Sequence, residues 1–246
     1  MSSYKVHYPN GKPPPPSRLP AAQFWGLCFV VYMLLQFPLV RIPIVFLSTW
    51  IHELGHGMGA VFTGGGFSKL TIYPPNLSGT ALTSTSNDFQ RLSVLFLGLL
   101  APSLLGVVMI FLTRGLSWYR ASLILLTVLL VLSQIWASDM FTRLTLAITA
   151  LIFGGMAWKV PSSWLVYITQ ILAIALCLDA LTDFRYFFMG GAIIDGVVMQ
   201  SDTTNISRIL GLRYWFWGAV VTLLSIIILV IGVFFSDKWA RDHPRA

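Results

Sequence analysis

Charged side chains are scarce in this chain of 246 residues, of which they make up 10%. Ordinary soluble domains carry about 25% charged residues. Here 56% of the residues are hydrophobic, and the mean hydropathy is +0.77. Several apolar runs reach the roughly 18 residues that indicate a membrane-spanning helix, and none alternates as barrel strands do. The composition therefore excludes an ordinary soluble domain and indicates a protein of the lipid bilayer.

The length of the apolar runs sets the fold class. We expect an all-α polytopic membrane protein with six to seven transmembrane helices. Arg41 and Pro43 separate the first two runs, which predicts a break in the helix there. The candidate spans lie at about residues 22–40, 44–62, 90–113, 119–137, 141–158, 163–188 and 213–235.

Polar segments flank and interrupt these runs. We expect residues 1–21 to be a disordered polar tail, residues 22–236 to form a single transmembrane domain, and residues 237–246 to be a basic tail. After the second run, FSKLTIYPPNLSGTALTSTSND holds two strand-like pieces, near 67–73 and 79–85, around a turn-forming PPNLSG. This segment predicts a small β-hairpin.

Cysteine is nearly absent, and acidic residues are fewer than basic ones. Cys28 and Cys177 both lie in apolar runs, which excludes a disulfide framework. The 16 basic residues outnumber the 9 acidic ones, but they are scattered between apolar spans. Because no basic patch forms, we expect no nucleic-acid partner. The basic residues also divide almost evenly between the two sides of the bilayer, so they leave the orientation open.

Three ionisable residues interrupt the second apolar run, in TWIHELGHGMGAVFTGG. His52 and His56 are four residues apart, so both imidazoles lie on one helix face and can reach one Zn²⁺. Glu53, the only glutamate in the chain, can act as general base. An unpaired charge at this depth costs at least about 2.5 kcal/mol, so it needs a partner. A buried polar network without metal is the alternative. Close helix packing is the role expected for Gly55, Gly57 and Gly59.

The segment HELGHGMGAVFTGG resembles the site-2 protease family of intramembrane zinc metalloproteases. LTIYPPNLSGTALT is similar to the membrane-associated β-hairpin of that family, and LGLLAPSLLG resembles the span after it. CLDALTDFRYFF and QSDTTNISRILGLRYWFWG resemble the C-terminal part of a compact bacterial-type branch that lacks a PDZ domain. The resemblance covers residues 44–113 and 164–235.

The resemblance implies a third metal ligand, an aspartate, but the family's Asn-Pro-Asp-Gly sequence does not occur in this chain. Asp183 is the preferred candidate, because it matches the compact branch and is expected on a helix. Asp179, one turn earlier, and Asp195, in IIDG, are the alternatives. An aspartate of the 179 and 183 pair could instead orient a histidine or pair with Arg185. Asp202 is interpreted as a helix N-cap rather than a ligand.

These residues lead to three hypotheses for function. In the first, one catalytic Zn²⁺ activates water with Glu53, and the protein hydrolyses peptide bonds of transmembrane proteins. The hairpin could then bind the extended substrate as an added strand. In the second, the protein is a protease-derived scaffold or assembly factor that binds membrane proteins without cleaving them. In the third, it carries zinc. The sequence favours the first.

The same interpretation gives expectations for location and partners. We expect an integral multi-pass protein, by resemblance in a bacterial inner membrane. The partners are the lipid bilayer, a transmembrane substrate and a possible membrane protein that gates access. The chain shows no PDZ-like segment that could measure a substrate's outer domain.

Overall fold

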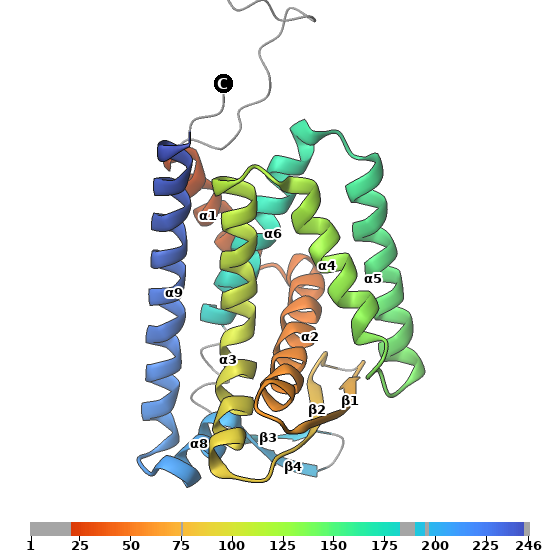
Figure 1. The fold of residues 1–246 in the computed structure, drawn as a ribbon, viewed down its shortest axis with the longest axis vertical. Helices are drawn as coiled ribbons and strands as arrows, with labels where there is room; N and C mark the ends of the chain where they lie inside the picture. Colours follow the sequence, from red (N-terminus) through yellow and green to blue (C-terminus); the bar gives the residue numbers. More distant parts are fainter. Residues whose placement is uncertain (1–20, 75, 183–189, 195–196, 244–246) are drawn as a thin grey trace, which may run out of the picture.

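The computed structural model describes residues 21–74, 76–182, 190–194 and 197–243. Helices dominate this part of the chain, and Figure 1 shows them packed side by side, with the strands gathered near one end of the bundle. The C-terminal end of the last helix, α9, lies at the other end of the bundle (Figure 1). The elements are α1 (Ala21–Leu34), α2 (Pro38–Phe62), β1 (Gly66–Ile72), β2 (Gly79–Ser84), α3 (Asp88–Ile110), the π-helix η1 (Phe111–Gly115), α4 (Tyr119–Ser133), α5 (Met140–Lys159), α6 (Ser162–Thr182), β3 (Gly191–Ile194), β4 (Val197–Gln200), α8 (Asp202–Leu210) and α9 (Tyr214–Asp242).

Four of the described helices are long and apolar enough to cross a bilayer: α3 with η1, α5, α6 and α9. Helices α1 and α2 form a further candidate, bent by 104° at the break between them. Helix α4 is apolar but only 15 residues long. The expected helical, polytopic fold is confirmed, although not every apolar run forms a full-length straight span.

The break between the first two apolar runs lies earlier than predicted. Helix α1 ends at Leu34 and α2 begins at Pro38, so Arg41 and Pro43 lie inside α2. The predicted position of the break was therefore wrong. Pro38 explains the start of α2, because a proline at the first helical position lacks an N–H that would have no partner there.

The last helix is longer than predicted. Helix α9 continues to Asp242, so most of residues 237–246, expected to be a tail, extends the helix. Within this extension, Asp237 accepts a 2.5 Å hydrogen bond from the buried guanidinium of Arg114 in η1. This contact ties the end of α9 to the end of α3.

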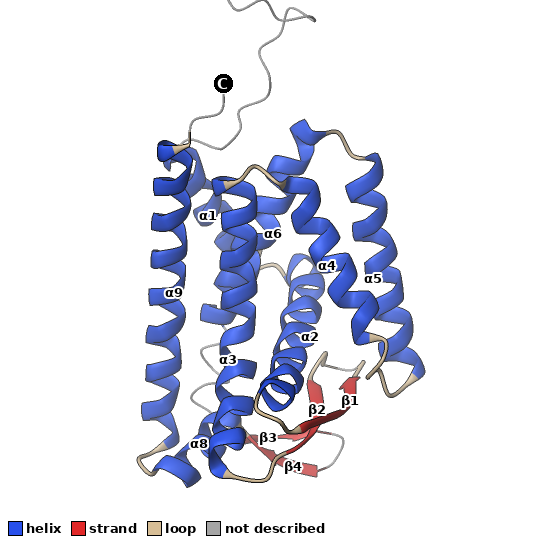
Figure 2. Ribbon diagram, in the orientation of Figure 1, coloured by secondary structure: helices blue, strands red, loops and turns tan. Residues whose placement is uncertain are grey.

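The predicted hairpin is confirmed as an antiparallel pair of β1 and β2. The other edge of β1 is occupied by the connection between α4 and α5: Leu70 donates its N–H to the Trp136 carbonyl and accepts from the Ser138 N–H. Thr142 of α5 accepts the Ile72 N–H at 2.9 Å. Among the described strands β2 pairs only with β1, and both strands contact α2. A second hairpin, β3 with β4, was not predicted (Figure 2).

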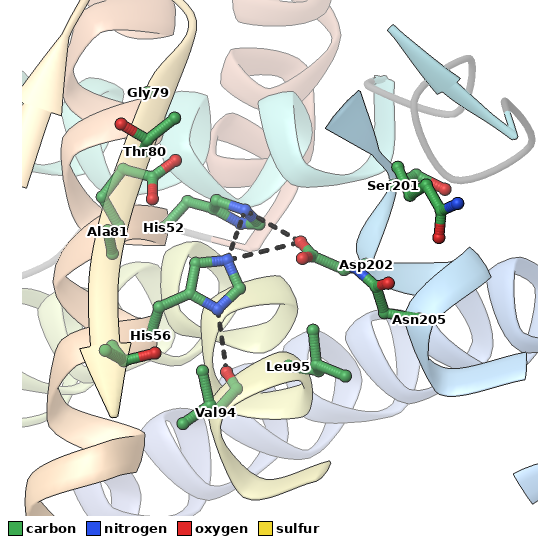
Figure 3. A pocket seen from close by; sticks show the side chains of 13 residues that line it. His52, His56, Gly79, Thr80, Ala81, Val94, Leu95, Ser201, Asp202 and Asn205 are labelled. Atoms are coloured by element: carbon green, nitrogen blue, oxygen red, sulfur yellow. Dashed lines mark hydrogen bonds and ion pairs between the residues drawn. The ribbon is translucent and has the colours of Figure 1, made fainter. Parts of the chain in front are cut away.

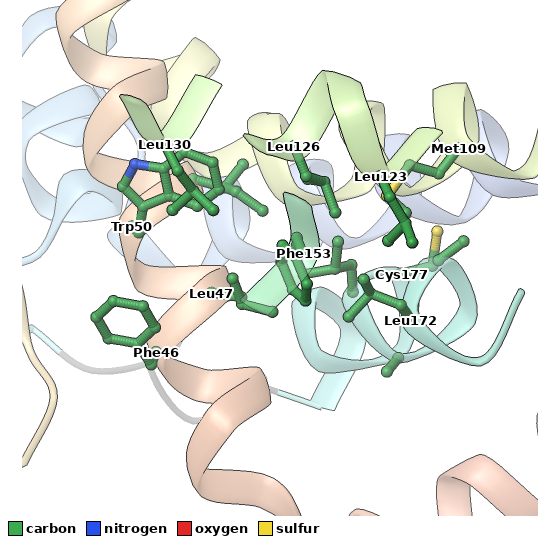
Figure 4. Packing of buried hydrophobic residues seen from close by; sticks show 14 of the residues in the cluster. Phe46, Leu47, Trp50, Met109, Leu123, Leu126, Leu130, Phe153, Leu172 and Cys177 are labelled. Atoms are coloured by element: carbon green, nitrogen blue, oxygen red, sulfur yellow. The ribbon is translucent and has the colours of Figure 1, made fainter. Parts of the chain in front are cut away.

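A core of apolar side chains joins α2 to the neighbouring helices. Figure 4 shows Phe46, Leu47 and Trp50 of α2 near residues of α4, α5 and α6. Trp50 is fully buried, and its indole N–H donates to the Ser133 hydroxyl of α4 at 2.9 Å. This packing fixes α2 about its own axis and so determines which way the next turn of the helix, carrying the H-E-x-x-H motif, points.

Candidate metal centre

The two motif histidines lie side by side on one face of α2. His52 Nε2 and His56 Nε2 are 3.0 Å apart. His56 Nδ1 lies 2.9 Å from the Val94 carbonyl oxygen on α3. Because a carbonyl oxygen only accepts, Nδ1 carries a proton, so Nε2 is the ring nitrogen left to bind a metal.

A carboxylate from the far end of the sequence completes the group. Asp202 Oδ2 lies 3.1 Å from His52 Nε2 and 3.3 Å from His56 Nε2 (Figure 3). Asp202 is the first residue of α8, and the preceding Ser201 caps this helix by accepting the Thr204 N–H. Since Ser201 serves as the cap, the Asp202 side chain is available to the histidines.

The donor set and its spacing fit a zinc ion. The three atoms are 3.0 to 3.3 Å from one another. Ligands at about 2.0–2.1 Å in a tetrahedral zinc site are separated by about 3.3 Å. Two imidazoles and one carboxylate leave the fourth position open, as catalytic zinc sites do. Burial alone would raise the pKa of the Asp202 carboxyl, but the charges and hydrogen bonds of His56 and His52 hold it well below its usual value. The carboxylate is therefore the anion that a cation requires.

Glu53 faces the hairpin rather than the three donor atoms. The residue is only 5% exposed, and the backbone of Ala81 on β2 hydrogen-bonds to its carboxylate. Gly79 on the same strand lies so close that an added Cβ would be 2.7 Å from Glu53 Oε1. The β2 strand thus holds the carboxylate beside the histidines.

A cavity of about 220 Å³ brings these groups together. Strand β2 forms one wall, the motif residues line its interior, and the start of α8 forms the opposite wall (Figure 3). The lining residues are His52, Glu53, His56, Gly79, Thr80, Ala81, Thr83, Val94, Leu95, Gln200, Ser201, Asp202 and Asn205. The donor atoms and the Glu53 carboxylate therefore share one space with residues of β2.

Glycines allow α2 and α3 to approach closely, as the sequence predicted for Gly55 and Gly59. The same prediction was wrong for Gly57, which faces the Phe67 ring of β1. A Cβ at Gly55 would lie 2.6 Å from the Ala101 Cβ, and one at Gly59 would lie 2.9 Å from the Ser93 carbonyl oxygen. On α3, a Cβ at Gly98 would lie 2.2 Å from the His56 ring. Because Gly98 has no side chain, the His56 ring fits between the two helices.

The predicted third ligands lie elsewhere or outside the described residues. Asp179 is buried, and its Oδ1 lies 3.8 Å from Arg41 Nε. Asp183, the preferred candidate, and Asp195 lie outside the described residues. The interpretation of Asp202 as an N-cap was wrong, because Ser201 occupies that position. The sequence contained a usable signal. Ser201 to Thr204 are four consecutive residues of types that can cap a helix, but a helix has a single N-cap position. The other three side chains are therefore available for other roles.

Comparison with known proteins gives one match. The model of the peptidase M50B-like family matches residues 24–232, which include both histidines, Glu53 and Asp202. The chain matches no curated protein and no solved structure.

Proposed function

Because the chain belongs to the peptidase M50B-like family, we propose that it is an intramembrane zinc endopeptidase that cleaves transmembrane proteins. The observation that carries the proposal is the convergence of His52, His56 and Asp202 beside the buried Glu53. The polytopic helical fold supports it, since the site lies on α2, part of a bent apolar helix pair. We further propose a bacterial inner membrane as its location and a gating membrane protein as a possible partner.

In the proposed mechanism, three side chains bind the metal and a fourth moves the proton. His52, His56 and Asp202 would hold Zn²⁺, with Asp202 in place of the predicted Asp183. When bound, zinc supplies a Lewis acid and lowers the pKa of water toward neutrality. Glu53 takes a proton from the attacking water and passes it to the leaving amine nitrogen. Val94 keeps the His56 ring in its binding tautomer.

The substrate segment must be extended before it is cut. In a transmembrane helix the carbonyl groups are hydrogen-bonded within the helix, so attack requires local unwinding. Since β1 is already paired on both sides, the second edge of β2 would offer the backbone partners for an extended segment, apart from the Ala81 group that bonds to Glu53. Thr80, Ala81 and Thr83 of β2 line the cavity, so a strand added there passes beside Glu53.

Cleavage of defined substrates tests the proposal. The probes are fusion proteins with one transmembrane helix between two reporter domains, some with glycine and proline near the helix centre, reconstituted with the protein in liposomes. The wild type should cleave the unwound forms and contain one zinc ion per chain. Glu53→Gln should keep the zinc and lose cleavage, because the amide cannot accept the proton.

Zinc content tests the ligand set separately. Asp202→Asn should reduce bound zinc sharply, since an amide replaces the anionic ligand. Asp179→Asn is the matched control and should keep zinc, because Asp179 faces Arg41. Full zinc occupancy in Asp202→Asn would contradict the assignment of Asp202 and favour Asp183 as the third ligand. Function that survives Glu53→Gln in cells would support a non-cleaving scaffold instead.

A further inference from the structure

Asn205 lies on the cavity wall opposite β2. It follows Asp202 by three residues on α8, so the two side chains occupy the same helix face. Figure 3 shows them next to each other at the start of α8, across the cavity from Gly79 to Ala81. Asn205 is half-buried and reaches the same space as the motif residues.

The amide of Asn205 has no structural task within the described part of the chain. There, no hydrogen bond joins its side chain to a protein group, whereas its backbone N–H bonds to Ser201 within the start of the helix. Two nearby residues, Ser201 and Asp202, do make side-chain contacts within the protein. The Ser201 hydroxyl caps α8, and the Asp202 carboxylate contacts both histidines. The cavity therefore contains a neutral donor whose hydrogens can meet a ligand.

A donor on this wall would assist hydrolysis. An extended peptide paired with β2 presents alternate backbone groups to β2 and to the far side of the cavity. The carbonyl oxygen under attack gains negative charge, and a fixed N–H donor stabilises that charge more in the transition state than in the substrate. Glu53 and Asp202 can only accept while ionised, and the Nε2 atoms of both histidines are turned to the metal position.

We propose that Asn205 is a catalytic residue whose side-chain N–H donates a hydrogen bond to the carbonyl oxygen of the peptide bond being cleaved. The assignment rests on the proposed peptidase function. It gives α8 two tasks, since one turn of this helix supplies both an anionic metal ligand and a neutral donor for the substrate.

Steady-state kinetics on the same fusion proteins, with zinc content measured on each sample, test the assignment. Asn205→Ala should keep one zinc ion per chain and lower kcat about 100-fold with little change in KM, as loss of one oxyanion donor does in other hydrolases. Asn205→Asp keeps the side-chain shape but replaces the donor with an acceptor, and should be at least as slow. Arg208→Ala, on an exposed position of the same helix, is the matched control and should match the wild type.

The outcomes separate this assignment from the function on which it rests. Glu53-dependent cleavage by the wild type together with unchanged kcat in Asn205→Ala overturns the role of Asn205 alone. Loss of zinc in parallel with activity also overturns it, because Asn205 would then only position Asp202. A wild type without Glu53-dependent cleavage overturns the proposed function and this assignment with it.

Discussion

Adding one methyl group at Gly98 should displace a metal ligand without removing any of the metal-binding atoms. A Cβ at this position of α3 would lie 2.2 Å from His56 Cε1 and 2.3 Å from Nδ1, whereas ordinary van der Waals contact begins near 3.4 Å. The imidazole or the helix must therefore move by about 1.2 Å. Metal-ligand distances in proteins vary by only about 0.2 Å, so a displacement of this size disrupts the site.

The expected result of Gly98→Ala is weaker zinc binding. Changes that misplace a ligand histidine lower metal affinity by about 10- to 100-fold, or about 1.4 to 2.8 kcal/mol. Competition with a fluorescent zinc chelator measures this affinity in purified protein. Gly155→Ala on α5 is the matched control, because no atom lies within 4 Å of its added Cβ. Wild-type zinc affinity in well-folded Gly98→Ala would refute the reasoning.

Two further predictions concern a contact of Glu53 and the cap of α5. Gly79→Ala should keep zinc but reduce cleavage at least 10-fold, because the new Cβ meets the Glu53 carboxylate; equal activity in liposome assays would contradict this. Asp139→Ala should lower the free energy of unfolding by about 1 kcal/mol, because Asp139 caps α5 by accepting the Thr142 N–H at 2.9 Å. Partial burial raises the pKa of Asp139, but bonds from Thr142 and Ser138 lower it more, so its folded pKa lies below the unfolded value of about 3.9. Its stabilisation is therefore present above about pH 4 and is lost as the pH falls through the folded pKa. Thermal unfolding in detergent at pH 7 and pH 3 should show a smaller difference between the variant and the wild type at pH 3 than at pH 7.

The sequence was sufficient for features that depend on short spacing. His52 and His56 are neighbours because a helix repeats every 3.6 residues, and the hairpin follows from a turn between two strand-like pieces. The predicted end of the second apolar run at residue 62 agrees with the end of α2, after which Gly64 adopts a left-handed φ of 82°.

The partner of the two histidines depends on the tertiary fold. Asp202 lies far along the chain from His56, and only the packing of α8 against α3 and α9 brings it back to α2. The preference for Asp183 came from family resemblance and position on a helix, neither of which measures distance to α2. The second hairpin did leave a local signal: Asp-Gly stands between two apolar pieces that form β3 and β4.

The donor atoms of the candidate metal centre come from widely separated parts of the chain, two from α2 and one from α8. An ion held by these atoms acts as a cross-link between the N-terminal and C-terminal parts of the protein. Its binding free energy then contributes to keeping α8 in place against the bundle. Chelation should therefore release the far wall of the cavity as well as stop the chemistry, and faster proteolysis around residues 200–213 would reveal it.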